Sequence, residues 1–197
     1  MEQPLISFDL DGVLANPPLG WNPAINRDVS LQPNAQSPPA CTPLPDDRLG
    51  TLLTHTWYRL RYVLRPPRPG ALDAVRAAAR GHEVIVLTGR HERGRRQTQA
   101  WLDQHGFSPF LSDLVMNVGR LGSARHKEAV LSDRAVMLHA DDDAATAALL
   151  ARNGITVALL DWPRNRGLEY PAGVTRYRHM EELAAELAGE SKIRERQ

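Results

Sequence analysis

Short apolar runs alternate along the chain with segments of helical periodicity. Runs of strand length occupy residues 4–8, 83–88, 115–118, 135–139, 155–160 and 174–177. Helical spacing predicts helices over residues 70–80, 92–105, 124–132, 143–152 and 180–187. Strands that alternate with helices in this way favour a parallel sheet covered on both faces. We therefore predict an α/β fold with a doubly wound, mostly parallel, Rossmann-like sheet.

One long segment, residues 15–66, departs from this alternation. Its first part, residues 15–46, contains eight prolines and no sustained period, and residues 47–64 place leucines and Trp57 at helical spacing. A crossover between parallel strands needs far fewer residues. We expect residues 1–14 and 67–189 to form the core, residues 15–66 a small, partly helical cap over the crevice, and residues 190–197 a charged tail that frays.

The composition bounds the class of protein. With 197 residues, of which 42% are apolar and 24% charged, the chain can bury one full core plus a small appendage. It has no run of about 18 apolar residues and no leader pattern at its start. Cys41 is the only cysteine, so no internal disulfide or thiolate metal cluster forms. We expect a cytoplasmic location and no membrane partner; the sequence leaves the oligomeric state open.

Two carboxylates, Asp9 and Asp11, directly follow the first predicted strand. Ligands of open α/β sheets bind at the carboxyl ends of the strands, so both residues are expected to line a crevice there. A calcium loop also begins Asp-x-Asp, but its fifth and twelfth positions would here be Val13 and Gly20, which are not ligands. A solvated turn rich in aspartate is the remaining alternative.

The second strand ends in a turn suited to phosphate, with the hydroxyl of Thr88 followed by Gly89 and Arg90. Backbone N–H groups before a helix N-terminus bind anions. The alternative is a threonine that caps the helix beside a turn glycine.

A lysine and an acidic cluster complete the candidate chemistry. Lys127, one of two lysines, lies near the start of a predicted helix, where it can neutralise a phosphoryl oxygen; the alternative is an exposed lysine. Asp141, Asp142 and Asp143 follow the third main strand, and adjacent carboxylates repel unless a cation or hydrogen bonds hold them. Oxygen ligands from Asp9 and Asp141 are typical of a magnesium site, whereas Asp143 is expected to cap the next helix.

These four groups of residues, in this order along the chain, resemble the sequence motifs of the haloacid dehalogenase superfamily of phosphotransferases. Phe8-Asp9-Leu10-Asp11-Gly12-Val13 looks like its nucleophile signature, and Leu87-Thr88-Gly89-Arg90, Lys127 and Asp141-Asp142 look like its later motifs. The resemblance implies that Asp9 attacks phosphorus to give an aspartyl-phosphate. It implies that Asp11 protonates the leaving oxygen and then activates water.

The same resemblance assigns the other roles. It implies a Mg²⁺ cofactor and catalytic roles for Thr88 and Lys127 beside the two aspartates. The phosphate-binding residues it implies are Asp11, Gly12, Thr88, Gly89, Arg90 and Lys127. The metal-binding residues it implies are Asp9, Asp11, Asp141 and Asp142, with the choice among residues 141–143 left open.

A narrower similarity points to the 5'(3')-deoxyribonucleotidase branch. It rests on residues 11–15, on Thr98-x-x-Trp101-Leu102 after the second motif, and on residues 160–166. The implied substrate is a nucleoside or deoxynucleoside monophosphate. Trp21, Trp57 and Tyr58 of the insertion are candidates to stack on the base, although Trp57 also fits the apolar stripe of its helix.

Other functions remain open at this point. Residues 48–96 hold eleven arginines against three acids, an excess that could follow the phosphates of a polynucleotide end. A sugar-phosphate phosphatase would use the same chemistry. A catalytically silent binding module of the same fold is the alternative of another class.

Overall fold

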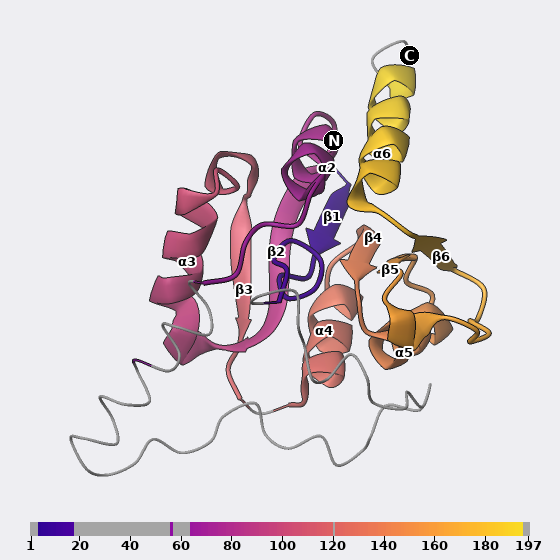
Figure 1. The fold of residues 1–197 in the computed structure, drawn as a ribbon. Coiled ribbons are helices and arrows are strands. Elements are labelled where there is room, and N and C mark those ends of the chain that lie inside the picture. The colour runs from indigo at the N-terminus through magenta and orange to yellow at the C-terminus, as the bar shows by residue number, and fades with distance from the viewer. Residues whose placement is uncertain (1–3, 18–55, 57–63, 120, 195–197) are drawn as a thin grey trace.

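The computed structural model describes residues 4–17, 56, 64–119 and 121–194, and within these ranges six strands form one parallel sheet (Figure 1). The strand order is β3-β2-β1-β4-β5-β6. The strands are β1 (Leu5–Phe8), β2 (Glu83–His91), β3 (Asp113–Asn117), β4 (Val136–Asp141), β5 (Val157–Leu160) and β6 (Val174–Tyr177). The predicted parallel sheet is confirmed.

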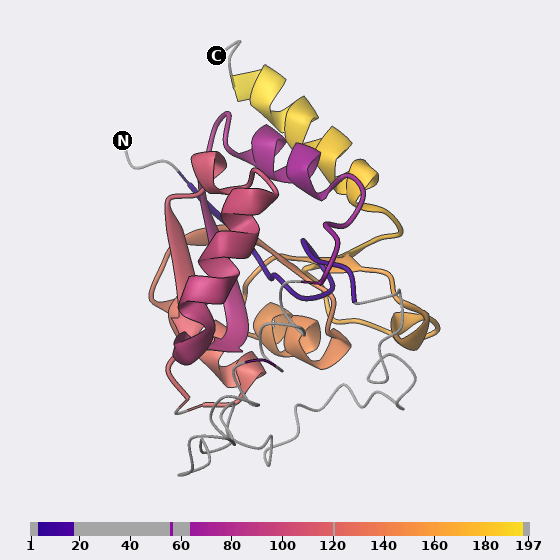
Figure 2. The same ribbon diagram turned by 60° about the vertical axis from the view of Figure 1, so that its left-hand side comes forward.

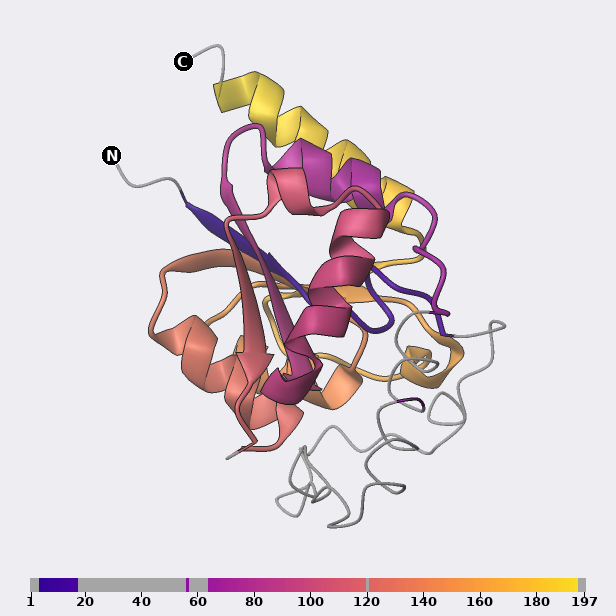
Figure 3. The same cartoon turned by 90° about the vertical axis from the view of Figure 1, so that its left-hand side faces the viewer.

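Helices cover both faces of the sheet. They are α2 (Ala71–Ala78), α3 (Arg95–Gln104), α4 (Ser123–Ser132), α5 (Ala144–Arg152) and α6 (Met180–Arg194), with short 3-10 turns η3 (Glu92–Gly94), η4 (Ser108–Phe110) and η5 (Pro163–Asn165). Helices α2 and α6 lie side by side, and α4 lies on the opposite side of the strands (Figure 2 and Figure 3). None of the described helices has the length and apolar character needed to cross a membrane.

Two apolar cores follow from the alternation of side chains along the strands. Val84 and Val86 of β2 face the core shared with α2, α3 and α6, whereas Ile85 and Leu87 face the core shared with α4 and α5. Successive strand residues point to opposite faces, so a strand buried on both sides reads as one continuous apolar run. This explains why the strands were visible in the sequence.

The sheet has a topological switch point beside β1. Strands β2 and β3 follow β1 in the sequence and lie on one side of it in the sheet, whereas the next strand, β4, lies on the other side of β1. The backbone N–H of Asp9 donates to the carbonyl of Ala140 at 2.8 Å, so the two strand ends are level. Open α/β sheets bind their ligands at this place.

Hydrogen bonds join the two ends of the segment that connects β1 to α2. Asn16 donates its N–H to the carbonyl of Pro66 at 2.9 Å, and Arg68 donates to the carbonyl of Leu14 at 2.8 Å. We call these two contacts the neck. The helix expected over 47–64 falls almost entirely outside the described residues, and the division into core and cap stays a prediction.

Some boundaries differ from those expected. Strand β2 continues to His91, three residues beyond the predicted end, because His91 pairs with Asn117 of β3. The predicted helix over 92–105 begins as the separate 3-10 turn η3. Helix α6 continues to Arg194, so the tail expected to fray is helical over residues 190–194.

The packing of Trp101 predicts a large cost for its removal. Its ring is buried at 1% exposure and stacks on Phe107 with centroids 5.5 Å apart, and its Nε1 donates to the carbonyl of Arg65 at 2.7 Å. We expect Trp101→Ala to lower the free energy of unfolding by about 3–5 kcal/mol in urea titrations. Trp101→Phe keeps most of the apolar contact and should cost clearly less; equal losses for both variants would show that apolar packing is not what the ring contributes.

Candidate active site

Three buried aspartates meet where β1 and β4 end. Oxygen atoms of Asp9, Asp141 and Asp142 all lie within 4.8 Å of one another. Asp9 Oδ1 is buried and accepts no hydrogen bond from the described residues. We call these three residues the acidic cluster. The predicted meeting of acids from the ends of two strands is therefore seen, and one buried carboxylate oxygen in it is available to a ligand.

Lys127 of α4 binds two members of the acidic cluster. Its Nζ lies 3.0 Å from Asp9 Oδ2 and 2.8 Å from Asp141 Oδ2, and the side chain is 2% exposed. Burial alone would lower the pKa of Lys127, but Asp141 and Asp9 together raise it above its ordinary value. Lys127 is therefore charged, and the alternative of an exposed lysine is excluded.

Asp141 is fully engaged by hydrogen-bond donors. Its Oδ1 accepts the N–H groups of Asp142 at 2.8 Å and Asp143 at 2.9 Å, and its Oδ2 lies 3.0 Å from His139 Nε2 besides Lys127. Burial tends to raise the pKa of Asp141, but Lys127 and His139 hold it below its usual range. Asp141 is thus a fixed anion.

His139 supports Asp141 from within the same strand. Burial lowers the pKa of His139, so the ring is neutral and donates Nε2–H to Asp141. Its Nδ1 then accepts the hydroxyl of Ser7 at 2.7 Å. Sequence reasoning gave His139 no role, and a histidine in an otherwise apolar strand was the available signal.

Asp142 is positioned by Arg164 and by Gly12. Arg164 donates to Asp142 Oδ2 at 2.9 Å and to its carbonyl at 3.1 Å. Burial raises the pKa of Asp142 well above its ordinary value, although Arg164 opposes the shift. Gly12 has a φ of 89°, and a Cβ there would lie 2.1 Å from Asp142 Oδ2. Only glycine fits at this position.

Asp11 stands apart from the acidic cluster. Arg90 donates to both of its oxygens at 2.7 Å, and Arg65 contacts Oδ1 at 2.7 Å. Its carboxylate is not grouped with Asp9, Asp141 and Asp142, which differs from the expected metal set. Arg90 was expected to bind phosphate. Its guanidinium instead donates hydrogen bonds to Asp11 and, at 3.2 Å, to Thr98 Oγ1.

The end of β2 brings α4 to the acidic cluster. Thr88 is 1% exposed, and its Oγ1 accepts the N–H of Arg90 at 3.2 Å. A Cβ on Gly89 would lie 2.2 Å from the hydroxyl of Ser123, the first residue of α4. Gly89 therefore permits the close approach that places Lys127, one helical turn further on, over Asp9.

Arginines account for most contacts that sequence reasoning missed. Besides Arg65 and Arg164, Arg68 donates to the carbonyl of Gly12 at 2.6 Å and lies 4.9 Å from the ring centroid of Trp162. The signal for Arg65 and Arg68 was their place in the arginine-rich segment 48–96.

Two further expectations concern the helix cap and the aromatic residues. Asp143 caps α5 as predicted, because its Oδ1 accepts the N–H of Thr146 at 2.8 Å. Trp21, Trp57 and Tyr58 lie outside the described residues.

The acidic cluster fits a divalent cation. Three carboxylates face two cationic side chains, Lys127 and Arg164, so one negative charge remains uncompensated if all three ionise. The open Oδ1 of Asp9 is buried where no group of the described chain satisfies it. Hard cations such as Mg²⁺ bind carboxylate oxygens of this kind.

Comparison with known proteins identifies the fold. No protein-family model matches the chain, and no curated protein is significantly similar in sequence. A haloacid dehalogenase-like hydrolase from Xanthomonas campestris matches with a TM-score of 0.61 and 11% identity, covering 100% of this chain and 99% of that chain. A second haloacid dehalogenase-like protein, SP0104 from Streptococcus pneumoniae, matches with a TM-score of 0.60 and 14% identity. This match covers 93% of this chain and 98% of that chain.

A third match comes from a chain of the Pnkp1/Rnl/Hen1 RNA repair complex. It has a TM-score of 0.54 and 16% identity, and it covers 81% of this chain but 43% of that one. At such identities the likeness establishes the fold: this chain has the fold of haloacid dehalogenase-like hydrolases. The fold expected from the sequence resemblance is confirmed.

The raised pKa of Asp9 predicts that the metal-free protein loses stability as the pH rises. Burial raises this pKa from 3.8 to about 7, against the opposing charge of Lys127. The folded state then binds more protons than the unfolded state, so stability present below pH 3.8 is lost as the pH rises through 7. In the presence of chelator, the free energy of unfolding of the wild type should therefore decrease with pH, relative to that of Asp9→Asn, by up to about 1.4 kcal/mol per pH unit.

Chemical unfolding at several pH values measures this difference. Asp73→Asn, on the exposed side of α2, is the control and should follow the wild type at every pH. A difference between wild type and Asp9→Asn that stays constant with pH would contradict the raised pKa.

Proposed function

We propose that this protein is a magnesium-dependent phosphomonoester hydrolase that works through an aspartyl-phosphate on Asp9. One observation carries the proposal: Lys127 pins Asp9 Oδ2, whereas Asp9 Oδ1 is buried without a partner among the described residues, inside an acidic cluster. A carboxylate held in this way is oriented for attack, and phosphoryl transfer depends mainly on such positioning and on charge neutralisation.

The proposed reaction has two displacements. In the first, a carboxylate oxygen of Asp9 forms a bond to phosphorus, the bond to the leaving oxygen breaks, and Asp11 gives that oxygen a proton. In the second, water attacks phosphorus, Asp11 takes the proton of the water, and phosphate leaves with Asp9 restored. Arg90 donates to both oxygens of Asp11 and so orients the carboxylate, and one of these contacts must open for Asp11 to hold the proton that it gives to the leaving oxygen.

The phosphoryl oxygens need donors around Asp9. Lys127 is the charged candidate, because it is buried and in contact with Asp9. Thr88, Gly89 and Gly12 stay proposed phosphate-binding residues through their hydroxyl or backbone groups. Arg90 is better assigned to Asp11 than to phosphate, given its two contacts there.

The hydrogen bonds favour Asp9 and Asp142 as metal ligands. Asp141 already accepts four contacts, two on each oxygen, which leaves it little capacity for a cation. Asp143 is occupied as a helix cap. Asp142 makes an ion pair, through Oδ2, to Arg164. When bound, Mg²⁺ would neutralise charge on the phosphoryl group.

A nucleoside or deoxynucleoside monophosphate is the preferred substrate. The sequence similarity to deoxyribonucleotidases supports this choice, and Trp21, Trp57 and Tyr58 stay its proposed base-binding residues. A polynucleotide-end phosphatase is the second candidate, supported by the structural match to a chain of an RNA repair complex.

A panel of substrates separates these functions. We expect phosphate release from nucleoside monophosphates with Mg²⁺ and none with chelator. Release confined to 3'-phosphorylated oligonucleotides would assign the protein to nucleic-acid ends, and release confined to sugar phosphates would assign it to those. No release from any compound would contradict the enzyme and favour a binding module.

Replacement of the nucleophile tests the covalent mechanism. Asp9→Asn should abolish turnover, with a loss of at least about 10³-fold, while circular dichroism and gel filtration stay those of the wild type. Lys127→Ala should also lose most activity. Unchanged turnover in Asp9→Asn would rule out attack by Asp9.

Single substitutions in the acidic segment test the ligand assignment. Asp142→Ala should weaken Mg²⁺ binding in calorimetric titration by at least about tenfold, since it removes a direct charged ligand. Asp143→Ala is the matched control, expected to bind Mg²⁺ as the wild type does but to destabilise α5 by about 1 kcal/mol. Wild-type affinity in Asp142→Ala with loss in Asp141→Ala would reverse the assignment.

A further inference from the structure

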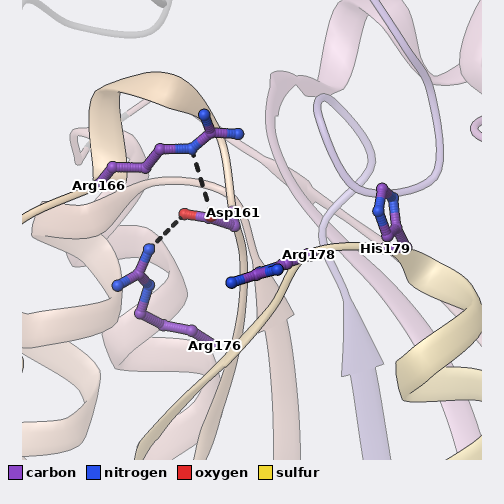
Figure 4. A pocket seen from close by; sticks show the side chains of 5 residues that line it. All are labelled: Asp161, Arg166, Arg176, Arg178 and His179. Carbon is purple, nitrogen blue, oxygen red and sulfur yellow. Dashed lines mark hydrogen bonds and ion pairs between the residues drawn. The ribbon is translucent and has the colours of Figure 1, made fainter.

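A polar cavity lies at the ends of β5 and β6, outside the acidic cluster. It has a volume of about 630 Å³ and is lined by Asp161, Arg166, Arg176, Arg178 and His179 (Figure 4). Small-molecule sites commonly have volumes of this size. Nothing in the proposed reaction uses this cavity.

The one acid in the cavity lining organises two of the arginines. Asp161 Oδ1 lies 2.6 Å from Arg176, and Asp161 Oδ2 lies 3.4 Å from Arg166. The Asp161 side chain is itself 8% exposed, so its carboxylate is covered. Each guanidinium has five N–H donors, and both arginines therefore keep donors for a ligand.

Arg178 adds a cation that no acid of the described chain neutralises. Its backbone N–H donates to Glu182, but within the described part of the chain its guanidinium makes no hydrogen bond or ion pair. The residue is exposed, and its side chain points toward Asp161 and Arg176 (Figure 4). Three arginines against one aspartate leave a formal charge of +2 in the lining, before any contribution from His179.

The cavity shares an edge of the sheet with the acidic cluster. Asp161 begins the loop after β5 that also carries Arg164, the partner of Asp142. Strand β6 is three positions from β1, which places their ends roughly 14 Å apart at the usual strand spacing. Long arginine side chains shorten this span, so one ligand can reach both places.

We propose that this cavity is a second phosphate subsite, which binds a phosphate group of the substrate other than the one that is cleaved. A guanidinium group can donate two parallel hydrogen bonds to two oxygens of one phosphate, and the surplus positive charge of the cavity lining favours a dianionic group. The proposal rests on the proposed phosphatase function. A nucleoside bisphosphate and a phosphorylated oligonucleotide end both supply this chemistry, and the volume leaves room for the group that carries the phosphate.

Direct binding tests the subsite without any turnover. Inorganic phosphate is titrated in chelator into the wild type, Arg178→Gln and Arg134→Gln, followed by backbone amide NMR shifts. Arg134, at the amino end of β4, pairs with Asp113 and serves as the matched control. We expect saturable shifts at residues 176–179 that weaken at least about tenfold in Arg178→Gln only. Shifts confined to other residues, or equal affinity in all three proteins, would overturn the subsite.

Kinetics then test whether the subsite serves the reaction. The substrates are p-nitrophenyl phosphate, a nucleoside 3',5'-bisphosphate and a 3'-phosphorylated dinucleotide. In Arg178→Gln, kcat/KM should fall about tenfold more for a substrate with two phosphates than for p-nitrophenyl phosphate, mainly through KM. The substrate that shows the larger loss identifies the source of the second phosphate.

The two proposals fail in different ways. Equal loss for all three substrates would overturn the second phosphate subsite and leave the phosphatase intact. No hydrolysis of any substrate by the wild type would overturn the phosphatase, and the NMR titration would still decide whether the cavity binds phosphate.

Discussion

The contact of one buried ammonium group with two buried carboxylates is the interaction on which this site depends. Burial of an ion costs several kcal/mol unless an opposite charge meets it at close range. Lys127 meets Asp9 and Asp141 within about 3 Å, and His139 adds a neutral donor to Asp141. When Asp9, Asp141 and Asp142 all ionise, one negative charge remains beside Lys127 and Arg164, and this charge favours the binding of a cation.

Close approach between backbones makes this interaction geometrically accessible. Gly89 lets the first residue of α4 come against the end of β2, and Gly12 lets the loop after β1 come against Asp142. Each glycine joins segments that are distant in the sequence. The chemistry of the site therefore depends on two positions that carry no side chain, as well as on the charged residues that they bring together.

The sequence predicts which residues belong to the site better than it predicts which of them contact one another. Strands buried on both faces leave continuous apolar runs, and residues just after such runs gather at one edge, so the meeting of Asp9 and Asp141 could be anticipated. Lys127 lies on α4, and its place at the site was expected through the family resemblance. The partners of Asp11 could not, because Arg65 and Arg90, which pair with it, lie more than 50 residues further along the chain. The hydrogen bond from His139 to Asp141 could not be predicted either, because both residues lie on β4 and the apolar pattern of that strand does not show which side chains contact each other.

The neck joins the two ends of the chain segment that connects β1 to α2. Because Asn16 bonds to Pro66 and Arg68 bonds to Leu14, the core itself holds the ends of the intervening segment together. The entropy of closing a loop grows only with the logarithm of its length, so a longer or shorter segment between these anchors would change folding stability little. The described contacts at Asn16, Pro66, Leu14 and Arg68 are thus anchors that can stay in place when the length of the connecting segment changes.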